Sequence, residues 1–379
     1  MDCGVLVHLC TPATWRMALA AGSLAPPSLL HEGFVHLSTP HQVTWPANAL
    51  YQGRTDLLAL VVDPARLPGE LRFERAPDAP AEVRFPHHYG PVPVASVVAV
   101  VPYQAGPDGR FTEPNGLPPP EDAVARVRLF DRALAQRRGA AVLPVNGGVA
   151  VLDPRYPASH EHNALWMDPG SHAATVAAEA DRVLGSAGLS HRRAVLDDPA
   201  TATALASQGW HILELRLLLY GSAPQPAANV PPGSITVVPV AHEVVSKLWQ
   251  RSWRRDQPGL DDDAVCQLVD GEALADAVLR VVNLAVLDGY GEPIAATQLR
   301  IDGATAAIEA VMTEPAHRRA GLARALVLDA LARARAAGCD AIFLTAVAGE
   351  WPHRWYTRLG FIDVGSRFQA TCARLSPIE

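Results

Sequence analysis

The sequence predicts an α/β (α+β) protein that is divided into several domains. Short apolar runs of strand length alternate with longer segments in which apolar residues recur at helical spacing. Two stretches rich in proline interrupt this alternation, and 379 residues exceed the size at which a single hydrophobic core usually stops growing. We therefore expect domains at 1–104, 122–221 and 234–379, joined by linkers at 105–121 and 222–233.

The composition is that of a folded protein without a strong overall charge. Hydrophobic residues make up 49% and charged residues 19%, which excludes an intrinsically disordered chain. The net charge of −7 supplies no basic field for nucleic acid. No apolar run of about 18 residues and no signal segment occurs, so we expect no membrane partner and a cytoplasmic location. The 5 cysteines form no CxxC pair, so no metal site is expected. Abundant Ala, Pro and Arg indicate a bacterial source.

Residues 1–104 predict a small α+β domain, because three buried apolar runs accompany a short helical segment. Thr11 is a suitable cap for the helix, since Pro12 follows at the first helical position. The expected elements are strands at Val5–Leu9, Leu57–Val62 and Val94–Val101, and a helix at Ala13–Ala21.

Polar residues gather near the expected strand ends of this domain. The segments 32–38 (EGFVHLS) and 85–91 (FPHHYGP) resemble a bacterial family known only as domain of unknown function 952. The His-Leu-Ser sequence is also similar to a motif of ADP-ribosyltransferase-like folds, which implies a nucleotide-handling site as an alternative function. Histidines that serve only the fold are the other alternative. The candidate residues are His8, His36, Ser38, Gln42, His87 and Tyr89.

Residues 122–221 also alternate between strand-like and helix-like segments, which predicts a further α/β layer. The expected strands are Ala141–Val145, Val149–Leu152, Ala164–Met167, Ala194–Leu196 and Ile212–Leu219, and the expected helices are Asp122–Arg138, Ala173–Ala187 and Ala200–Gly209.

The last domain is expected to combine an antiparallel strand pair with a strand–turn–helix unit. Asp288-Gly289 marks the turn of the pair, and Pro315 ends the later strand because proline cannot donate to a sheet ladder. The expected strands are Ile235–Val238, Val281–Leu287, Pro293–Ile301, Ala306–Thr313, Ala341–Val347 and Phe361–Val364, and helices are expected at His242–Arg251, Asp261–Val269, from Leu322 onward and at Trp351–Arg358.

A basic turn lies between the strand that ends at Thr313 and the following helix. Its backbone N–H groups, the positive end of the helix and two guanidiniums predict a phosphate or pyrophosphate site. A solvated helix cap is the alternative. The pattern Arg318-x-x-Gly321-x-Ala323, with Leu359-Gly360-Phe361 further on, resembles the acetyl-CoA loop of the GNAT superfamily of N-acetyltransferases.

This resemblance implies a C-terminal GNAT fold with a mixed central sheet and acetyl-CoA as the acetyl donor. It also implies that the strand before the loop splays from its neighbour and exposes backbone N–H groups. The cofactor-binding candidates are Val311, Met312, Thr313, Arg318, Arg319, Ala320, Gly321, Leu322, Ala323 and Arg324.

Two residues are candidates for proton transfer. Glu309 lies on the strand among apolar neighbours, where a carboxylate is costly unless it faces a cleft, so we expect a general base. A structural salt bridge is the alternative. Tyr356 matches the family tyrosine that protonates the departing thiolate, with core packing as the alternative. Gly349 stands where many relatives carry Asn, which weakens one expected cofactor contact.

Segments 163–166 (NALW) and 188–192 (GLSHR) resemble the N-terminal halves of tandem GNAT proteins, which keep the fold and lose the cofactor loop. Arg192-Arg193 is the nearest basic pair, but it enters a strand. We therefore expect residues 122–221 to be a degenerate GNAT-like unit that shapes a substrate cleft or an interface.

The resemblance implies acetyl transfer to a primary amine of a small molecule or a protein. Arg254 and Arg255 suit an acidic acceptor, whereas Asp261–Asp263 suit a cationic one. A non-catalytic acyl-CoA sensor is the alternative function, and a homodimer is left open.

Overall fold

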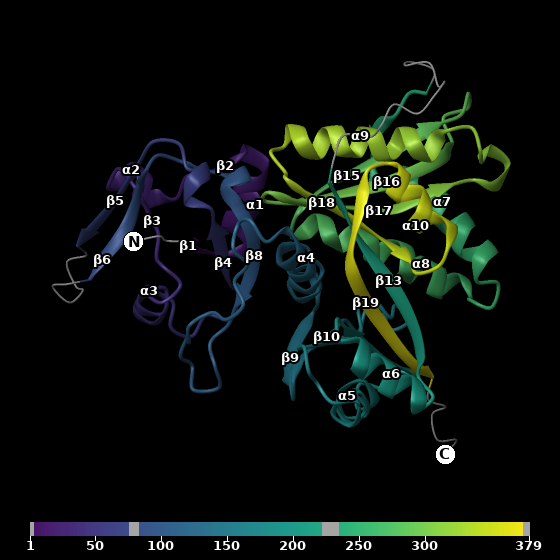
Figure 1. The fold of residues 1–379 in the computed structure, drawn as a ribbon, viewed down its shortest axis with the longest axis horizontal. Coiled ribbons are helices and arrows are strands. Elements are labelled where there is room, and N and C mark those ends of the chain that lie inside the picture. The colour runs from purple at the N-terminus through teal and green to yellow at the C-terminus, as the bar shows by residue number, and fades with distance from the viewer. Residues whose placement is uncertain (1–3, 76–82, 222–234, 374–379) are drawn as a thin grey trace.

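The computed structural model describes residues 4–75, 83–221 and 235–373. It confirms the mixed α/β class: a small N-terminal domain lies beside an 11-stranded mixed sheet with helices on both faces (Figure 1). Residues 105–121 contain neither helix nor strand, as expected for a linker. The expected linker 222–233 lies outside the described residues.

The N-terminal domain is built from three small sheets with the strand orders β1-β4-β8, β3-β6-β5 and β2-β7. The side chain of Thr11 accepts a hydrogen bond from the amide of Thr14 at 3.2 Å, which confirms the expected helix cap. Trp15 on that helix is completely buried in the domain core. The elements are β1 (Leu6–Cys10), α1 (Pro12–Ala21), β2 (Ser23–Leu24), α2 (Pro27–His31), β3 (Val35–His36), α3 (Thr44–Leu50), β4 (Leu57–Val62), β5 (Glu70–Arg75), β6 (Arg84–Tyr89), β7 (Val92–Pro93) and β8 (Val97–Tyr103).

The large sheet has the strand order β14-β15-β16-β17-β18-β13-β19-β12-β11-β10-β9. Neighbouring strands are antiparallel except for the pairs β17–β18 and β11–β12. Its first elements are α4 (Ala123–Arg138), β9 (Ala141–Val145), β10 (Gly148–Leu152), β11 (Ala164–Met167), α5 (Ala173–Ala180), β12 (His191–Leu196), α6 (Pro199–Ser207) and β13 (His211–Tyr220). The later elements are β14 (Val238–Val240), α7 (His242–Asp256), α8 (Asp262–Gly271), β15 (Arg280–Leu287), β16 (Pro293–Asp302), β17 (Thr305–Thr313), α9 (Leu322–Ala336), β18 (Ala341–Val347), α10 (Trp351–Arg358) and β19 (Phe361–Ala373).

The sheet consists of two halves that repeat one order of elements. The series β9-β10-β11-α5-β12-α6-β13 corresponds to β15-β16-β17-α9-β18-α10-β19. The last strands of the two halves are exchanged, because β13 pairs with β18 and β19 pairs with β12. These two long strands also pair with each other at the centre of the sheet (Figure 1). Residues 122–221 and 235–373 therefore share one continuous sheet.

The two faces of the sheet are covered by different helices. On β18, Leu344 packs into the core formed with α9 and α10. The adjacent residue Phe343 points to the opposite face, where its ring centroid lies 5.4 Å from that of Phe130 on α4. This alternation follows from the two-residue repeat of a strand. Helix α7 packs against β16, and its core contains Ala296 from that strand.

The N-terminal domain packs against the β16–β17 hairpin. The amide of Ala304 donates to the carbonyl of Val97 at 2.7 Å, and Nε1 of Trp15 donates to Oδ1 of Asp302 at 2.8 Å. Arg126 on α4 is 2% exposed and donates both to the carbonyl of Val98 and to that of Ala304. This junction lies at the start of β17, away from the basic turn that follows its end.

Several expected elements differ from the structure. The strand expected at Val94–Val101 is β8, which begins only at Val97 after a 3-10 turn at Val94–Ser96. The helix expected at His242–Arg251 is α7, which continues to Asp256. The strand expected at Ile235–Val238 is instead β14, which begins only at Val238. Strand β19 continues nine residues beyond Val364 to Ala373, since it pairs with both β13 and β12. The helix expected to reach Ala187 ends as α5 at Ala180 and continues as a π-turn at Asp181–Gly185.

Candidate functional site

Strands β17 and β18 separate partway along their length. Their parallel pairing ends at Ala307 and Phe343, although β17 continues to Thr313 and β18 to Val347. Ala310 has a positive φ of 51°, which is unusual for a residue with a Cβ. The register with β16 also shifts at this level of the sheet. The bulge bends β17 away from its neighbour and opens the gap that the family resemblance implied.

The loop after β17 presents a group of free backbone amides. Within the described residues, none of the amides of 319–324 donates a hydrogen bond to the protein, and the first helical bond runs from Ala325 to Gly321 at 3.1 Å. Gly321 has a φ of 85°, a left-handed conformation that glycine adopts without strain. Arg318 and Arg319 are exposed beside these amides. The loop therefore has the geometry of an anion site at the start of a helix of 15 residues.

Other cofactor candidates lie around this loop. In the part of the chain that the structure describes, the buried Oγ1 of Thr313 and Nε of Arg324 have no hydrogen-bond partner. The backbone oxygen of Thr313 accepts from Nε of Arg318 at 3.3 Å. Leu322 is a core residue, whereas Ala323 is only half-buried and Ala320 is exposed. Val311 packs against the α9 core, and Met312 packs on the α7 side.

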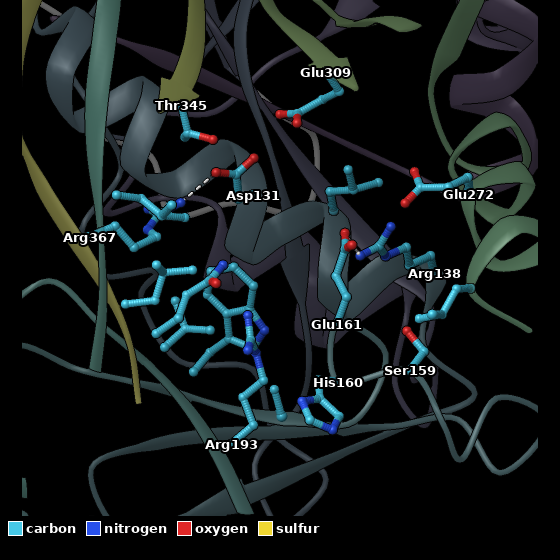
Figure 2. A pocket seen from close by; sticks show the side chains of 18 of the residues that line it. Asp131, Arg138, Ser159, His160, Glu161, Arg193, Glu272, Glu309, Thr345 and Arg367 are labelled. Atoms are coloured by element: carbon cyan, nitrogen blue, oxygen red, sulfur yellow. Dashed lines mark hydrogen bonds and ion pairs between the residues drawn. The ribbon is translucent and has the colours of Figure 1, made fainter. Parts of the chain in front are cut away.

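A cavity of about 600 Å³ lies on the face that carries α4 and α7, between the two halves of the sheet. Glu309 on β17 and Thr345 on β18 line it just beyond the last paired residues of those strands. The cavity therefore reaches the gap between β17 and β18. Trp166 on β11 lines the part contributed by the other half. Arg193 on β12 lines the same part (Figure 2).

The charged side chains that line the cavity comprise four carboxylates and four guanidiniums. Three pairs are formed among them: Asp131 with Arg367, Glu161 with Arg138, and Glu272 with Arg300. The remaining two groups are Glu309 and Arg193. Glu309 was predicted from the sequence, but the three ion pairs were not, because their members come from segments far apart in the chain. Charged residues within apolar strands, such as Arg300 and Arg367, were the available signal.

Glu309 is held in an environment that favours its neutral form. The pKa of Glu309 is raised to about 8, chiefly by burial; Arg300 opposes this shift, and the nearby carboxylates of Asp131 and Glu161 add to it. Within the described chain, its carboxylate forms no hydrogen bond and no ion pair. The geometry therefore does not match a salt-bridged structural carboxylate.

Tyr356 lies on the other side of the sheet from the cavity, in the core formed with α9. It is 7% exposed, and its ring lies 5.8 Å from that of Phe361. Burial raises the pKa of Tyr356, and the charge of Glu309 adds to this effect. The phenol therefore stays protonated at neutral pH. Tyr356 and Glu309 thus lie on opposite faces of the sheet, close enough for the charge of Glu309 to act on the phenol.

The expected substrate-facing residues are divided by the structure. Trp253 lines the cavity. Arg254 instead pairs with Asp262 at 2.8 Å, and Arg255 pairs with Asp256 at 3.0 Å. These arginines lie on a charged surface. Gly349 has a φ of 79° in an exposed turn, which asparagine also tolerates.

The N-terminal candidates come together only in part. The ring of His87 stacks on Phe34 with centroids 4.0 Å apart and lies 5.1 Å from the ring of His36. Glu74 accepts hydrogen bonds from His87 at 3.0 Å and from Tyr89 at 2.8 Å. Burial lowers the pKa of His87. Phe34 and Glu74 were not among the predicted site residues.

The other three N-terminal candidates serve local structure. Nδ1 of His8 lies 2.8 Å from the carbonyl oxygen of His36. Ser38 is buried in a backbone bridge to Val7. The amide group of Gln42 donates to the carbonyl of Arg84 at 2.9 Å.

The described part of the chain contains no cluster of three or more His, Cys, Asp or Glu side chains that could hold a metal ion. Among the described residues, no helix combines the length and the apolar character that crossing a membrane requires.

Comparison with known families identifies two parts of the chain. Residues 243–361 match the Acetyltransferase (GNAT) family, a class of acyltransferases. Residues 9–100 match the family described as Protein of unknown function (DUF952). The chain therefore joins a DUF952 domain to a GNAT acetyltransferase domain, as the sequence motifs predicted. No curated protein matches the sequence.

Several solved structures are similar to parts of this chain. A GCN5-related N-acetyltransferase from Kribbella flavida is 18% identical and covers 67% of this chain and 95% of its own, with a TM-score of 0.46. A conserved protein of unknown function from Staphylococcus epidermidis is 11% identical, with coverages of 62% and 94% and a TM-score of 0.49. Protein CC0527 from Caulobacter crescentus is 28% identical, with coverages of 28% and 93% and a TM-score of 0.26.

Proposed function

We propose that this protein is an N-acetyltransferase that uses acetyl-CoA to acetylate a primary amine of a small molecule. The observation that best supports this function is the position of Glu309. This unpaired carboxylate stands where the gap between β17 and β18 opens into the cavity. A volume of about 600 Å³ is in the range of small-molecule sites, which favours a small acceptor over a protein.

The residues after β17 fit the donor. The free amides of 319–324 would bind its pyrophosphate, with Arg318 and Arg319 adding charge. The unpartnered Oγ1 of Thr313 and Nε of Arg324 are polar atoms that a ligand would satisfy. The exposed N–H groups of β17 near Val311 would hold the pantetheine. When bound, acetyl-CoA supplies a thioester as the acyl donor.

Two side chains would move the protons. Glu309 takes one proton from the acceptor ammonium, directly or through a water, and leaves a neutral amine. The nitrogen lone pair then forms the C–N bond as the C–S bond breaks, and the second displaced proton leaves the nitrogen to solvent. Tyr356 gives its proton to the departing thiolate and regains one from solvent. Its raised pKa keeps that proton available at neutral pH.

We infer that residues 122–221 are a degenerate GNAT-like unit that completes the acceptor cavity. The repeated order of elements supports this, because it places 168–172 at the position of the phosphate loop. That segment begins with Asp168, which pairs with Arg132, and carries no arginine or lysine. This segment therefore lacks the guanidiniums that Arg318 and Arg319 supply in the other half, so a second donor site is not expected there.

The test is release of the CoA thiol from acetyl-CoA in the presence of a panel of primary amines. We expect release that depends on the amine, and a Tyr356→Phe variant with turnover reduced about 10-fold or more and nearly unchanged acetyl-CoA affinity. Binding without release from any amine would favour the acyl-CoA sensor. Unchanged turnover in Tyr356→Phe would remove that residue as the acid.

A second candidate function concerns the N-terminal domain. The stacked rings of Phe34 and His87, with Glu74 beside them, form a polar and aromatic cluster of the kind that binds a nucleotide base. Calorimetry of the full chain with NAD and ADP-ribose tests this candidate. Heat that is lost in His87→Ala would support it, and no heat with either compound would reject it.

A further inference from the structure

Not every charged side chain that lines the cavity forms an ion pair with another. Asp131, Glu161 and Glu272 each have a guanidinium partner, whereas Glu309 has no ion pair among the described residues. Arg193 is the corresponding exception among the guanidiniums. Its Nη1 donates to Oγ1 of Thr371 at 3.3 Å, and its buried Nε has no partner in the described chain.

Arg193 keeps its positive charge in this position. Burial lowers the pKa of Arg193, but a guanidinium starts so high that it stays protonated in proteins. Glu161 is close enough to influence Arg193, yet its ion pair is with Arg138. A buried cation without a carboxylate partner is costly, so an anion from outside the protein would be bound favourably.

The neighbours of Arg193 suit a ligand group rather than a counter-ion of the protein. His160 lines the same part of the cavity, and burial lowers its pKa to about 4, so its ring is neutral at pH 7. The buried Nε1 of Trp166 also lacks a partner within the described residues. Both side chains can supply N–H donors to an acid group. Figure 2 shows His160 and Arg193 at one end of the cavity and Glu309 with Thr345 at the other.

The two unpaired groups are carried by strands that lie far apart in the sheet. Arg193 is on β12 and Glu309 is on β17, and the strand order β17-β18-β13-β19-β12 separates them by four steps. At about 4.8 Å per step, roughly 19 Å of sheet lies between the two backbones. Both side chains extend from these backbones into the cavity, which shortens the span that a ligand must cover. Glu309 is nevertheless not among the charges that shift the pKa of Arg193. An acceptor whose amine and acid group are separated by several carbons suits this arrangement.

We propose that the acceptor is an elongated amine with an acidic group at its far end, whose amine lies at Glu309 and whose carboxylate or phosphate is bound by Arg193. This inference rests on the proposed acetyl transfer for its assignment of the amine end. It makes Arg193 a specificity-determining residue contributed by the half of the sheet that lacks a phosphate loop. The degenerate half thereby selects the substrate for the other half.

The experiment compares matched amines in the CoA-release assay with the full chain. The probes are ω-amino acids from γ-aminobutyrate to aminooctanoate, the ω-aminoalkyl phosphates of equal length and the alkylamines that lack the acid. Binding of each probe without acetyl-CoA is followed by the intrinsic tryptophan fluorescence of the chain, to which Trp166 and Trp253 contribute from the cavity wall. We expect kcat/KM to be at least about 10-fold higher for the longer acidic amines than for their neutral counterparts. The carboxylate and phosphate series show which acid is preferred.

The variant Arg193→Gln should reduce the ratio between acidic and neutral amines to near one and weaken binding of the acidic probes. Arg192→Gln is the matched control, because Arg192 is the next residue in the chain but does not line the cavity. Its side chain points to Gly185 and pairs with Asp181. This control should keep the preference for acid. Equal kcat/KM for acidic and neutral amines, or an acid preference that survives in Arg193→Gln, would overturn the inference while leaving acetyl transfer intact.

The binding measurement separates this inference from the proposed function. If acidic probes bind the wild type and not Arg193→Gln, but no amine releases CoA, the anion subsite stands and acetyl transfer fails. If neither binding nor release depends on the acid group, the subsite is rejected.

Discussion

At the scale of single residues, the most informative group is Glu309. Its position within an apolar stretch of sequence predicted that it faces a cleft, and the structure places it on the cavity wall. Arg193 shows the limit of that reasoning. The sequence presents Arg193 as half of a basic pair in a strand. Arg193 lacks a carboxylate partner because Glu161 forms its ion pair with Arg138. Such pairing is decided by side chains from distant segments.

Glu309 should control the pH dependence of acetyl transfer. Only its ionised form accepts a proton, and its pKa is raised to about 8. The rate should therefore rise with pH up to about 8 and then level off. We expect Glu309→Gln to lower kcat about 100-fold and to lose this rise, with acetyl-CoA affinity unchanged.

The measurement is a pH profile of kcat/KM for the wild type, for Glu309→Gln and for Glu121→Gln, which changes an exposed carboxylate in the linker. The range from pH 6 to 9 spans roughly one to two units on either side of that pKa. A wild-type profile that is flat over this range would contradict the role of Glu309 as base. The same conclusion would follow if both variants behaved alike.

At the scale of elements, individual strands and helices could be predicted but their exchange could not. Leu57–Val62, Ala141–Val145 and Ala341–Val347 have the bounds that apolar runs predicted. Apolar alternation predicts that β13 and β19 are strands, but it does not determine which neighbouring strands they pair with. Their partners are set by packing across the whole sheet, which a local pattern does not contain. The gap after Ala307 was implied only by the family resemblance.

The exchange predicts how fragments of the chain behave. A fragment of residues 234–379 lacks β13, so β18 loses its neighbour and Leu217 and Leu218, both completely buried, are missing from its core. We expect this fragment to be insoluble or unfolded alone, and to fold when it is coexpressed with residues 105–221 as a non-covalent complex. Solubility and circular dichroism measure this. A stable, folded 234–379 fragment on its own would show that the exchange does not support the C-terminal half.

At the scale of the whole molecule, the N-terminal domain is fixed to the sheet on the hairpin that begins β17. Arg126 joins three parts of the chain there, since it hydrogen-bonds Val98, Ala304 and Asp340. The proposed phosphate loop lies beyond the opposite end of β17. The N-terminal domain therefore leaves the proposed donor site open, and it is placed to stabilise the strand that carries Glu309.

Two glycines test the importance of this junction. A Cβ at Gly303 would collide with the carbonyl oxygen of Val97, and its φ is 68°. Gly291 has a similar φ of 81° in the preceding hairpin, with no atom near its Cβ position. We expect Gly303→Ala to destabilise the protein by about 2 kcal/mol or more and Gly291→Ala by about 1 kcal/mol. Thermal unfolding of both variants isolates the contact with Val97, and equal melting temperatures would contradict a tight junction.

The most direct test of acetyl-CoA binding at the basic turn is a calorimetric titration of the full chain with acetyl-CoA. We expect one site per chain, and an affinity at least about 10-fold lower when Arg318 and Arg319 are both changed to Ala. Arg16→Ala, on the exposed surface of α1, should bind like the wild type. No binding by the wild type, or equal affinity in the double variant, would contradict the assignment of residues 318–324 as the acetyl-CoA site.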